Sequence, residues 1–175
     1  PNYKEIEKQD LTCVKMMWLN YPHMPTGTNA TKEHFKEAVA FAKKHDIMLV
    51  NDNPYSFILN DNPLSLIETE GARDVAIELN SLSKTFNMAG WRVGMVVGKG
   101  EIIKSILQVK SNMDSGMFLG IQKGAVEALN CSKEWFKELN KTYIKRRKIV
   151  WEIFDILGCS YNKESAGLFV WAKLP

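Results

Sequence analysis

The amino-acid sequence predicts an α/β fold in which a mostly parallel sheet is flanked by helices. Short apolar runs of strand length alternate with longer segments in which apolar residues recur every three or four positions. This alternation is typical of parallel sheets, because parallel neighbours are joined by helical crossovers. Polar clusters follow three of the apolar runs directly. Ligands of such sheets bind at the carboxyl ends of the strands, so these clusters are predicted to share one crevice.

Four apolar runs are predicted to form the main sheet. They are residues 14–19, 47–50, 75–79 and 93–98. Residues 168–171 are predicted to form another strand near the end of the chain, and residues 80–90 are predicted to be a loop. The tryptophans at 18, 151 and 171 and most methionines are predicted to lie in the core.

The segments between and after these runs are predicted to be helical. They are residues 31–45, 101–110, 119–129 and 132–157. Asn29 or Thr31 is the predicted N-cap of the first helix. Gly158 is predicted to end the last helix, whose length indicates a connection between two domains. Its predicted apolar positions, interrupted at Arg146, are Phe136, Leu139, Tyr143, Val150, Ile153 and Leu157.

The composition is globular and excludes several classes of protein. The 175 residues are 45% hydrophobic and 25% charged, with a net charge of +3. That charge is too small for a nucleic-acid-binding surface, and the basic run at 145–148 is predicted to be a solvated helix face. No apolar run is long enough to cross a membrane. The three cysteines lie far apart and are predicted to be free thiols, which favours the cytoplasm. Because the chain starts at Pro1 and ends just after a strand pattern, we expect it to be a piece of a longer protein.

A lysine with neighbouring hydroxyl groups follows the third predicted strand. Lys84 ends the sequence Ser-Leu-Ser-Lys, and Arg92 comes eight residues later. A lysine amine that can lose its proton forms a Schiff base with an aldehyde. The hydroxyls of Ser81 and Ser83 can donate to a phosphate, which also matches the guanidinium of Arg92. A surface lysine in a serine-rich loop, with Arg92 in a salt bridge, explains the same residues equally well.

An acidic residue follows the second predicted strand. Asp52 opens the sequence Asp-Asn-Pro-Tyr, which ends at Tyr55. A buried carboxylate needs a positive partner, and a protonated pyridine nitrogen would be one. At about 4 Å, with an effective dielectric constant near 20, the two charges attract by roughly 4 kcal/mol, which favours the pyridinium. Tyr55 could donate to an oxygen on the same ring. Taken alone, the motif is better explained as an ordinary turn.

Three motifs in this order resemble the class I/II aminotransferases, which are pyridoxal-phosphate enzymes of fold type I. They are Tyr-Pro-His-Met-Pro-Thr-Gly at 21–27, Asp52-x-x-Tyr55, and Ser81-x-Ser83-Lys84 followed by Arg92-x-Gly94. The resemblance extends from about residue 11 to the end of the chain. It is greatest to the branch that includes aspartate and LL-diaminopimelate aminotransferases.

The resemblance implies pyridoxal 5′-phosphate as the cofactor, with roles for six residues of this chain. Lys84 would hold the cofactor as a Schiff base and then move a proton between the substrate Cα and the cofactor carbon C4′. Asp52 would pair with the pyridine nitrogen, and Tyr55 would bond the ring oxygen O3′. The phosphate would be bound by Ser81, Ser83 and Arg92. The substrates would be an amino acid, such as aspartate, and a 2-oxo acid, and the protein would be a homodimer.

The resemblance also implies a division into domains. Residues 1–131 would be the C-terminal portion of the cofactor-binding large domain, residues 132–157 an inter-domain helix, and residues 158–175 the start of a small α+β domain. The family's other cofactor- and substrate-binding segments would lie outside this chain, so we expect the chain alone to have weak or no activity. Met24 stands where the family has an asparagine that meets O3′ and the substrate carboxylate. Methionine has no donor, and no substrate-binding role is carried over to it.

Several alternatives share these residues. A C–S lyase or a cyclopropane-forming synthase of fold type I would use the same electron sink. A non-catalytic ligand-sensing domain, as in regulators that resemble aminotransferases, belongs to another class. So does an α/β interaction domain without a cofactor. A yellow colour with pyridoxal phosphate would exclude the last of these.

Overall fold

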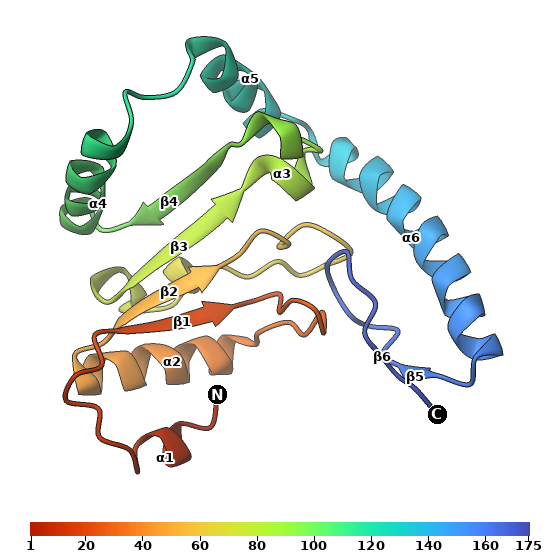
Figure 1. The fold of residues 1–175 in the computed structure, drawn as a ribbon, viewed down its shortest axis with the longest axis horizontal. Helices are drawn as coiled ribbons and strands as arrows, with labels where there is room; N and C mark the ends of the chain where they lie inside the picture. The colour runs from red at the N-terminus through yellow and green to blue at the C-terminus, as the bar shows by residue number, and fades with distance from the viewer.

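The main sheet contains four strands in the order β1-β2-β3-β4 (Figure 1). The structure is a computed structural model that describes all of residues 1–175. Strands β1 to β3 are parallel, whereas β4 runs antiparallel to β3. The predicted α/β fold with a mostly parallel sheet is therefore confirmed. The bounds of the strands are Met16–Asn20 (β1), Met48–Asp52 (β2), Ala76–Ser81 (β3) and Gly94–Gly98 (β4).

Helix α2 (Lys32–His45) packs against the sheet and forms the larger core. Thr31 is its N-cap, because the Thr31 hydroxyl accepts a hydrogen bond from the backbone N–H of His34. Helix α1 (Tyr3–Ile6) and the 3₁₀ turns η1 (Leu66–Glu68) and η2 (Ala72–Asp74) lie around this core. The buried residues that meet there include Leu19, Phe35, Ala38, Val39, Ala42, Leu49, Leu66 and Ala76.

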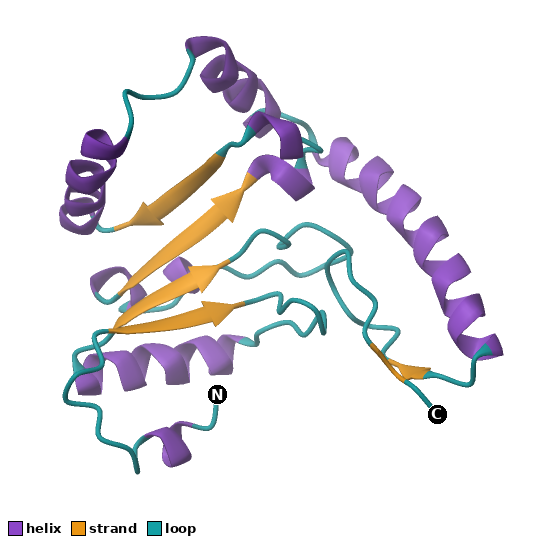
Figure 2. Ribbon diagram, viewed as in Figure 1, coloured by secondary structure: helices purple, strands orange, loops and turns teal.

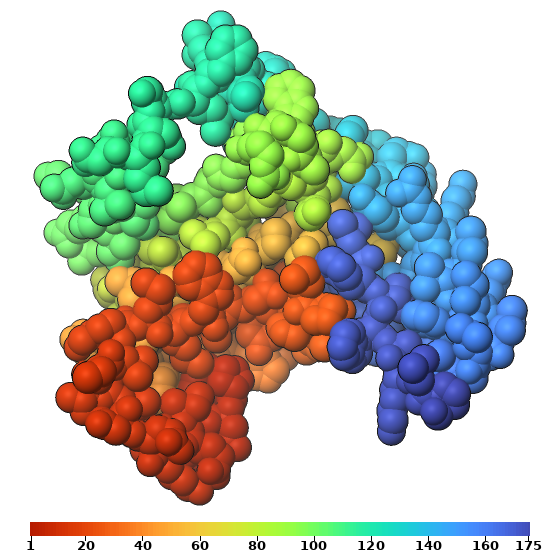
Figure 3. Space-filling view, in the orientation of Figure 1, coloured from red at the N-terminus to blue at the C-terminus, as the bar shows by residue number.

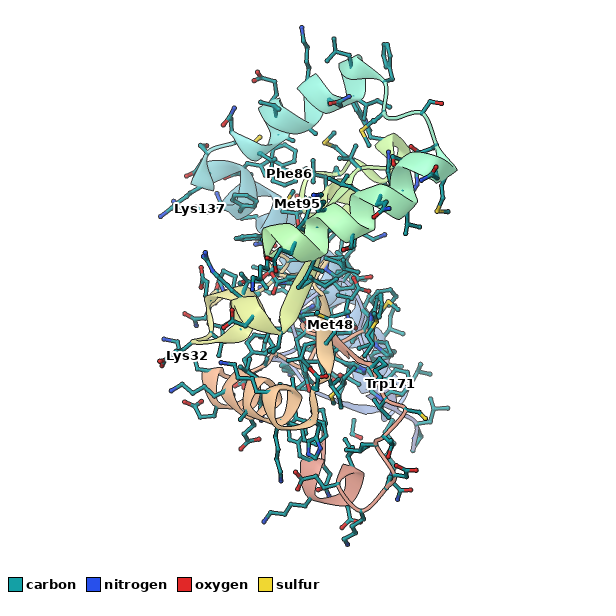
Figure 4. The ribbon with its side chains drawn as sticks, turned by 90° about the vertical axis from the view of Figure 1, so that its left-hand side faces the viewer. Lys32, Met48, Phe86, Met95, Lys137 and Trp171 are labelled. Carbon is teal, nitrogen blue, oxygen red and sulfur yellow. The ribbon has the colours of Figure 1, made fainter.

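A smaller cluster lies beyond β3. The predicted loop at residues 80–90 instead contains helix α3 (Leu82–Thr85) and the start of the 3₁₀ turn η3 (Ala89–Trp91). Ser81 caps α3 by accepting from the N–H of Ser83, so a residue expected in a loop begins a helix. Phe86 and Met95, labelled in Figure 4, pack against the buried residues of this cluster together with side chains of α5. The buried residues of the cluster are Leu82, Met88 and Val93.

Three helices complete the chain. They are α4 (Gly100–Met113), α5 (Leu119–Leu129) and the long α6 (Lys133–Ile156). Neither α4 nor α5 contains a buried residue. Gly158, just beyond α6, has a φ of 69°, as expected of a glycine that ends a helix. No helix combines the length and the apolar character that a membrane crossing requires.

The strand predicted at residues 168–171 is wrong. The only strand pairing near the end of the chain joins β5 (Ser160–Tyr161) to β6 (Ala172–Lys173). The apolar run instead makes side-chain contacts, because the ring of Phe169 lies edge-on to the ring of Tyr55 with centroids 6.0 Å apart. The apolar run at 168–171 therefore reflects side-chain packing and not the pairing of a β-strand.

The basic run at 145–148 is not solvated throughout, because Arg147 is buried with 8% of its surface exposed. The predicted apolar positions Ile153 and Leu157 are 49% and 56% exposed. Arg147 lies on the inner face of α6, where its guanidinium donates hydrogen bonds to two backbone carbonyls. The spacing of apolar residues in the sequence does not reveal such bonds.

Two of the three tryptophans predicted for the core lie at the surface. Trp18 is 59% exposed and Trp171 is 60% exposed, and Met16 beside Trp18 is 53% exposed. Alternation along β1 directs Leu19 into the core and Trp18 to the opposite face of the sheet. Nothing in this chain covers that face at Trp18.

Replacing Phe35 by alanine tests the core of α2. Phe35 is 2% exposed, so Phe35→Ala removes a ring from a packed site and leaves a cavity. The free energy of unfolding should fall by about 3–5 kcal/mol, measured by urea unfolding. The exposed neighbour Lys36 is the control, and Lys36→Ala should change it by less than about 0.5 kcal/mol. Equal effects of the two substitutions would contradict the assigned packing.

Candidate active site

The carboxyl ends of β1, β2 and β3 lie at the same edge of the sheet, where loops and α3 follow them (Figure 2). Asn20 at the end of β1 is the register partner of Asp52 at the end of β2, and Asp52 is the partner of Leu79 in β3. Ser81 lies two residues beyond Leu79. Because alternate residues of a strand face the same side, Asn20, Asp52 and Ser81 occupy one face of this edge.

Asn20 connects the ends of the first two strands, a role that the sequence analysis did not assign. Its side-chain amide donates to the backbone carbonyl of Asp52 over 2.7 Å. Its side-chain oxygen accepts from the backbone N–H of Met24 over 2.7 Å. Asn20 thereby fixes the loop that carries Met24 against the end of β2. An amide residue at the end of a predicted strand was the available signal.

The carboxylate of Asp52 is partly buried and has no partner in the structure. No hydrogen bond or ion pair reaches its side-chain oxygens, and burial raises the pKa of this carboxyl above its ordinary value. A partly buried acid without a donor is stabilised by a positive group that arrives with a ligand. The sequence predicts Asp52 in the loop just past the strand, whereas the structure makes it the last residue of β2.

The fully buried carboxylate of this region belongs to Glu78, which the sequence analysis missed. Glu78 is 3% exposed, lies in β3, and accepts hydrogen bonds from five groups. One is the side-chain amide of Asn53, the residue after Asp52, at 3.2 Å. Glu78 therefore fixes the start of the loop after β2. Its other donors are the side chains of Asn51, Ser65 and Asn80 and the backbone N–H of Leu66.

Tyr55 is 7% exposed and extends from the loop after β2 to the loop after β1. Its hydroxyl donates to the sulfur of Met24 over 3.3 Å. Burial first, and the nearby negative charge of Asp52 second, raise the pKa of the Tyr55 hydroxyl above its ordinary value. The phenol therefore stays a donor at neutral pH, and it lies close enough to Asp52 to respond to its charge.

Helix α3 presents Lys84 at the end of β3. Leu82 and Thr85 are 1% and 4% exposed and attach the helix to the protein, whereas Lys84 is only partly buried. Its amine makes no hydrogen bond or ion pair. The indole N–H of Trp135, at the start of α6, donates to the backbone carbonyl of Thr85 over 3.0 Å. The lysine thus lies on a short helix that is held at both ends and has a free amine.

Arg92 lies at the return from α3 to β4. Its backbone has a φ of 56°, and its guanidinium donates to the backbone carbonyl of Ala89 over 2.8 Å. Because Ser81 is the register partner of Gly94, Arg92 lies two residues before the partner of Ser81. No hydrogen bond joins Arg92 or Lys84 to Asp52 or Tyr55. Asp52 lies near enough to Tyr55 for its charge to affect the pKa of the Tyr55 hydroxyl. Ser81, Ser83, Lys84 and Arg92 lie at the end of the neighbouring strand.

The polar side chains lie at the carboxyl ends of three parallel strands of an α/β sheet, which is the edge where ligands of such sheets bind. A model of the family described as "Aminotransferase class I and II" matches residues 2–175. The chain belongs to this family. It is 43% identical to an LL-diaminopimelate aminotransferase of Gloeobacter violaceus and 40% identical to one of Maridesulfovibrio salexigens, over its whole length.

Solved structures show the same likeness. The apo-BacF structure from Bacillus subtilis matches with a TM-score of 0.94 at 37% identity, covering 100% of this chain and 45% of that one. An aminotransferase from Staphylococcus aureus matches with a TM-score of 0.90 at 33% identity, covering 100% and 47%. The chain spans 45% and 46% of the lengths of the two curated relatives named above.

The free groups of the site fit pyridoxal phosphate, which offers an aldehyde, a ring nitrogen and a phosphate. Lys84 provides an amine without a partner, and Asp52 a carboxylate without a partner. The Ser81 hydroxyl accepts from the N–H of Ser83, which leaves its own hydrogen free to donate. Four of the five N–H groups of Arg92 are not used in the one bond that it makes.

Replacing Asp52 by asparagine tests whether the carboxylate lacks a stabilising partner in the folded protein, through the pH dependence of stability. Because its pKa is raised in the folded protein, the folded state holds this proton to a higher pH than the unfolded state does. The carboxyl therefore costs stability as pH rises above its ordinary pKa of 3.8, and this cost persists at neutral pH. Without added cofactor, Asp52→Asn should raise the melting temperature at pH 7 and have no such effect below pH 3.8.

The exposed Asp61 is the control for this measurement, because it lies further along the loop that follows β2, nine residues beyond the strand end. Asp61→Asn should leave the melting temperature unchanged at both pH values. A lower melting temperature of Asp52→Asn at pH 7 would show that the carboxylate has a stabilising partner in the free protein.

Proposed function

We propose that this chain is part of a pyridoxal-phosphate-dependent transaminase, which moves an amino group between an amino acid and a 2-oxo acid. One observation carries the proposal: the carboxylate of Asp52, which ends β2, and the amine of Lys84, which follows β3, both lack partners and belong to adjacent parallel strands at one edge of the sheet. The names of the relatives support LL-diaminopimelate or a similar amino acid, such as aspartate, as the donor.

Pyridoxal phosphate supplies the electron sink that makes the Cα–H of a bound amino acid acidic. Asp52 holds a proton on the ring nitrogen, because its charge favours the protonated ring. Tyr55 donates its hydroxyl to the ring oxygen. Lys84 would hold the cofactor at its aldehyde through its amine, and the same amine would move the proton between Cα and C4′ as general base and then general acid. The phosphate is bound by Ser81, Ser83 and Arg92.

The domain division and the partners of the protein belong to the same proposal. Residues 1–131 form part of the cofactor-binding domain, residues 132–157 connect the domains, and residues 158–175 begin the small domain. The protein acts as a cytoplasmic homodimer. The exposed apolar residues of α4 and α5 support further contacts, since these helices bury no residue in this chain. They include Leu107, Val109, Leu119, Val126 and Leu129.

Replacing Lys84 tests the proposal directly. The protein that contains this chain should become yellow with pyridoxal phosphate, and borohydride should bleach the colour. Lys84→Ala should abolish the yellow colour and lower transaminase kcat by at least about a thousandfold, because the proton-transfer group is lost. Absorbance and a donor panel of aspartate, diaminopimelate, alanine and aromatic amino acids provide the measurements.

The control is Lys104, an exposed lysine of α4. Lys104→Ala should remain yellow and active. A wild-type protein that stays colourless with added cofactor would refute the proposal. Colour without amino transfer to any 2-oxo acid would instead favour one of the other fold type I chemistries.

The isolated chain of 175 residues should transaminate weakly or not at all. It spans less than half the length of the named relatives, and substrate binding is proposed to need the remainder. The comparison is the specific activity of the purified chain against that of the longer protein, under identical cofactor and substrate concentrations. Equal specific activities would contradict this part of the proposal.

A further inference from the structure

Arg147 is a buried charged residue to which neither the sequence nor the proposed function assigns a role. It lies in α6, is 8% exposed, and has no carboxylate partner. Its guanidinium donates to the backbone carbonyl of Ser165 and, over 2.6 Å, to that of Gly167. Burying a charge is costly unless hydrogen bonds compensate, so these two bonds determine where residues 165–167 lie.

Residues 165–167, called here the crossing segment, bridge the loops that follow β1 and β2. The N–H of Ala166 donates to the carbonyl of Gly27 over 2.8 Å, and the N–H of Gly167 donates to the carbonyl of Ile58 over 2.8 Å. The C-terminal part of the chain, dark blue in Figure 3, lies directly against the orange loop after β1. The crossing segment is thus bonded to both loops and to α6.

The fit at this crossing is close. A Cβ at Gly27, whose φ is 70°, would lie 2.5 Å from the carbonyl oxygen of Ala166. Gly167 is less tightly enclosed, because a Cβ there would lie 3.6 Å from the Cβ of Tyr55, at ordinary contact distance. The ring of Phe169, two residues further, lies edge-on to the ring of Tyr55. The crossing segment and Phe169 therefore support Tyr55, whose hydroxyl meets Met24 in the other loop.

Two more side chains of α6 contact backbone groups near the site. Trp135 bonds the carbonyl of Thr85, next to Lys84. Asn140 donates to the carbonyl of Phe57 over 3.1 Å and accepts from the N–H of Leu59 over 2.9 Å. Helix α6 is therefore attached to the lysine helix and to the loop that carries Tyr55. Arg147 adds the third attachment, at the crossing segment.

We propose that Arg147 is a positioning residue, which holds the crossing segment across the two loops and thereby orients the Tyr55 hydroxyl toward the cofactor. This inference rests on the proposed function, because it is there that Tyr55 donates to the cofactor ring oxygen. Arg147 itself is not proposed to touch substrate or cofactor. Its effect passes through backbone carbonyls to Gly167 and from there to Tyr55.

The test compares Arg147→Met with Arg147→Lys, Tyr55→Phe and the control Arg146→Met in the protein that contains this chain. Arg146 is the adjacent, exposed arginine. The first measurement needs no cofactor: trypsin cleavage after Lys163, an exposed residue just before the crossing segment. Arg147→Met should accelerate this cleavage by about tenfold or more, because local opening becomes easier, and Arg146→Met should not.

The second measurement is the pH midpoint of the colour change of the yellow holoenzyme. A hydrogen bond from Tyr55 stabilises negative charge on the ring oxygen, so its loss favours protonation and moves the midpoint to higher pH. Arg147→Met should move the midpoint in the same direction as Tyr55→Phe, and the double variant should match Tyr55→Phe alone. Arg147→Lys keeps the charge and one donor group, so it should restore part of both effects.

The outcomes separate this inference from the proposed function. Faster cleavage with an unchanged midpoint would mean that Arg147 is only structural, and would overturn the positioning role. Unchanged cleavage would overturn the role of Arg147 at the crossing segment. A wild-type protein without yellow colour would refute the proposed function, and with it the orienting role, while cleavage would still report on the crossing segment. If Arg147→Met does not fold, Arg147→Lys decides by the same two measurements.

Discussion

The parallel pairing of β2 with β1 and β3 is the constraint on which the site depends. Parallel register places the last residues of the three strands at one edge, and the pleat directs Asn20, Asp52 and Ser81 to the same face. The core of α2 and the hydrogen bonds to Glu78 maintain this register beneath the site. The chemistry then requires only that loops present groups at positions that the sheet has already defined.

The polar groups of this region differ in how well they are satisfied. Glu78, deep in the sheet, has five donors, and Arg147 has two carbonyls, so both are structural elements of a packed interior. The side chains of Asp52 and Lys84, by contrast, have no partners. Charged side chains without partners at a strand end, next to buried charges that have several partners just below it, distinguish a ligand site from a buried network.

Much of the fold followed from apolar spacing, because strands and long helices repeat with periods that a sequence displays. The four main strands and α2, α4, α5 and α6 agree with their predicted segments to within a few residues. The motif residues also lie at or near the ends of strands.

The features that were missed depend on contacts between distant segments. The buried charges of Glu78 and Arg147 are stabilised by hydrogen bonds to groups that are mostly far away in the chain. The one-turn helix that carries Lys84 is too short to display a period, and the exposure of Trp18 reflects the absence of a covering layer.

Lys84 and Asp52 are proposed to act on opposite sides of one bound cofactor. A crystal structure of the protein with pyridoxal phosphate would locate both side chains relative to the ring. We expect a covalent bond between the amine of Lys84 and the aldehyde carbon, with an Asp52 oxygen about 2.6–3.2 Å from the ring nitrogen. A cofactor bonded to another lysine, or a ring nitrogen that faces away from Asp52, would refute this proposal.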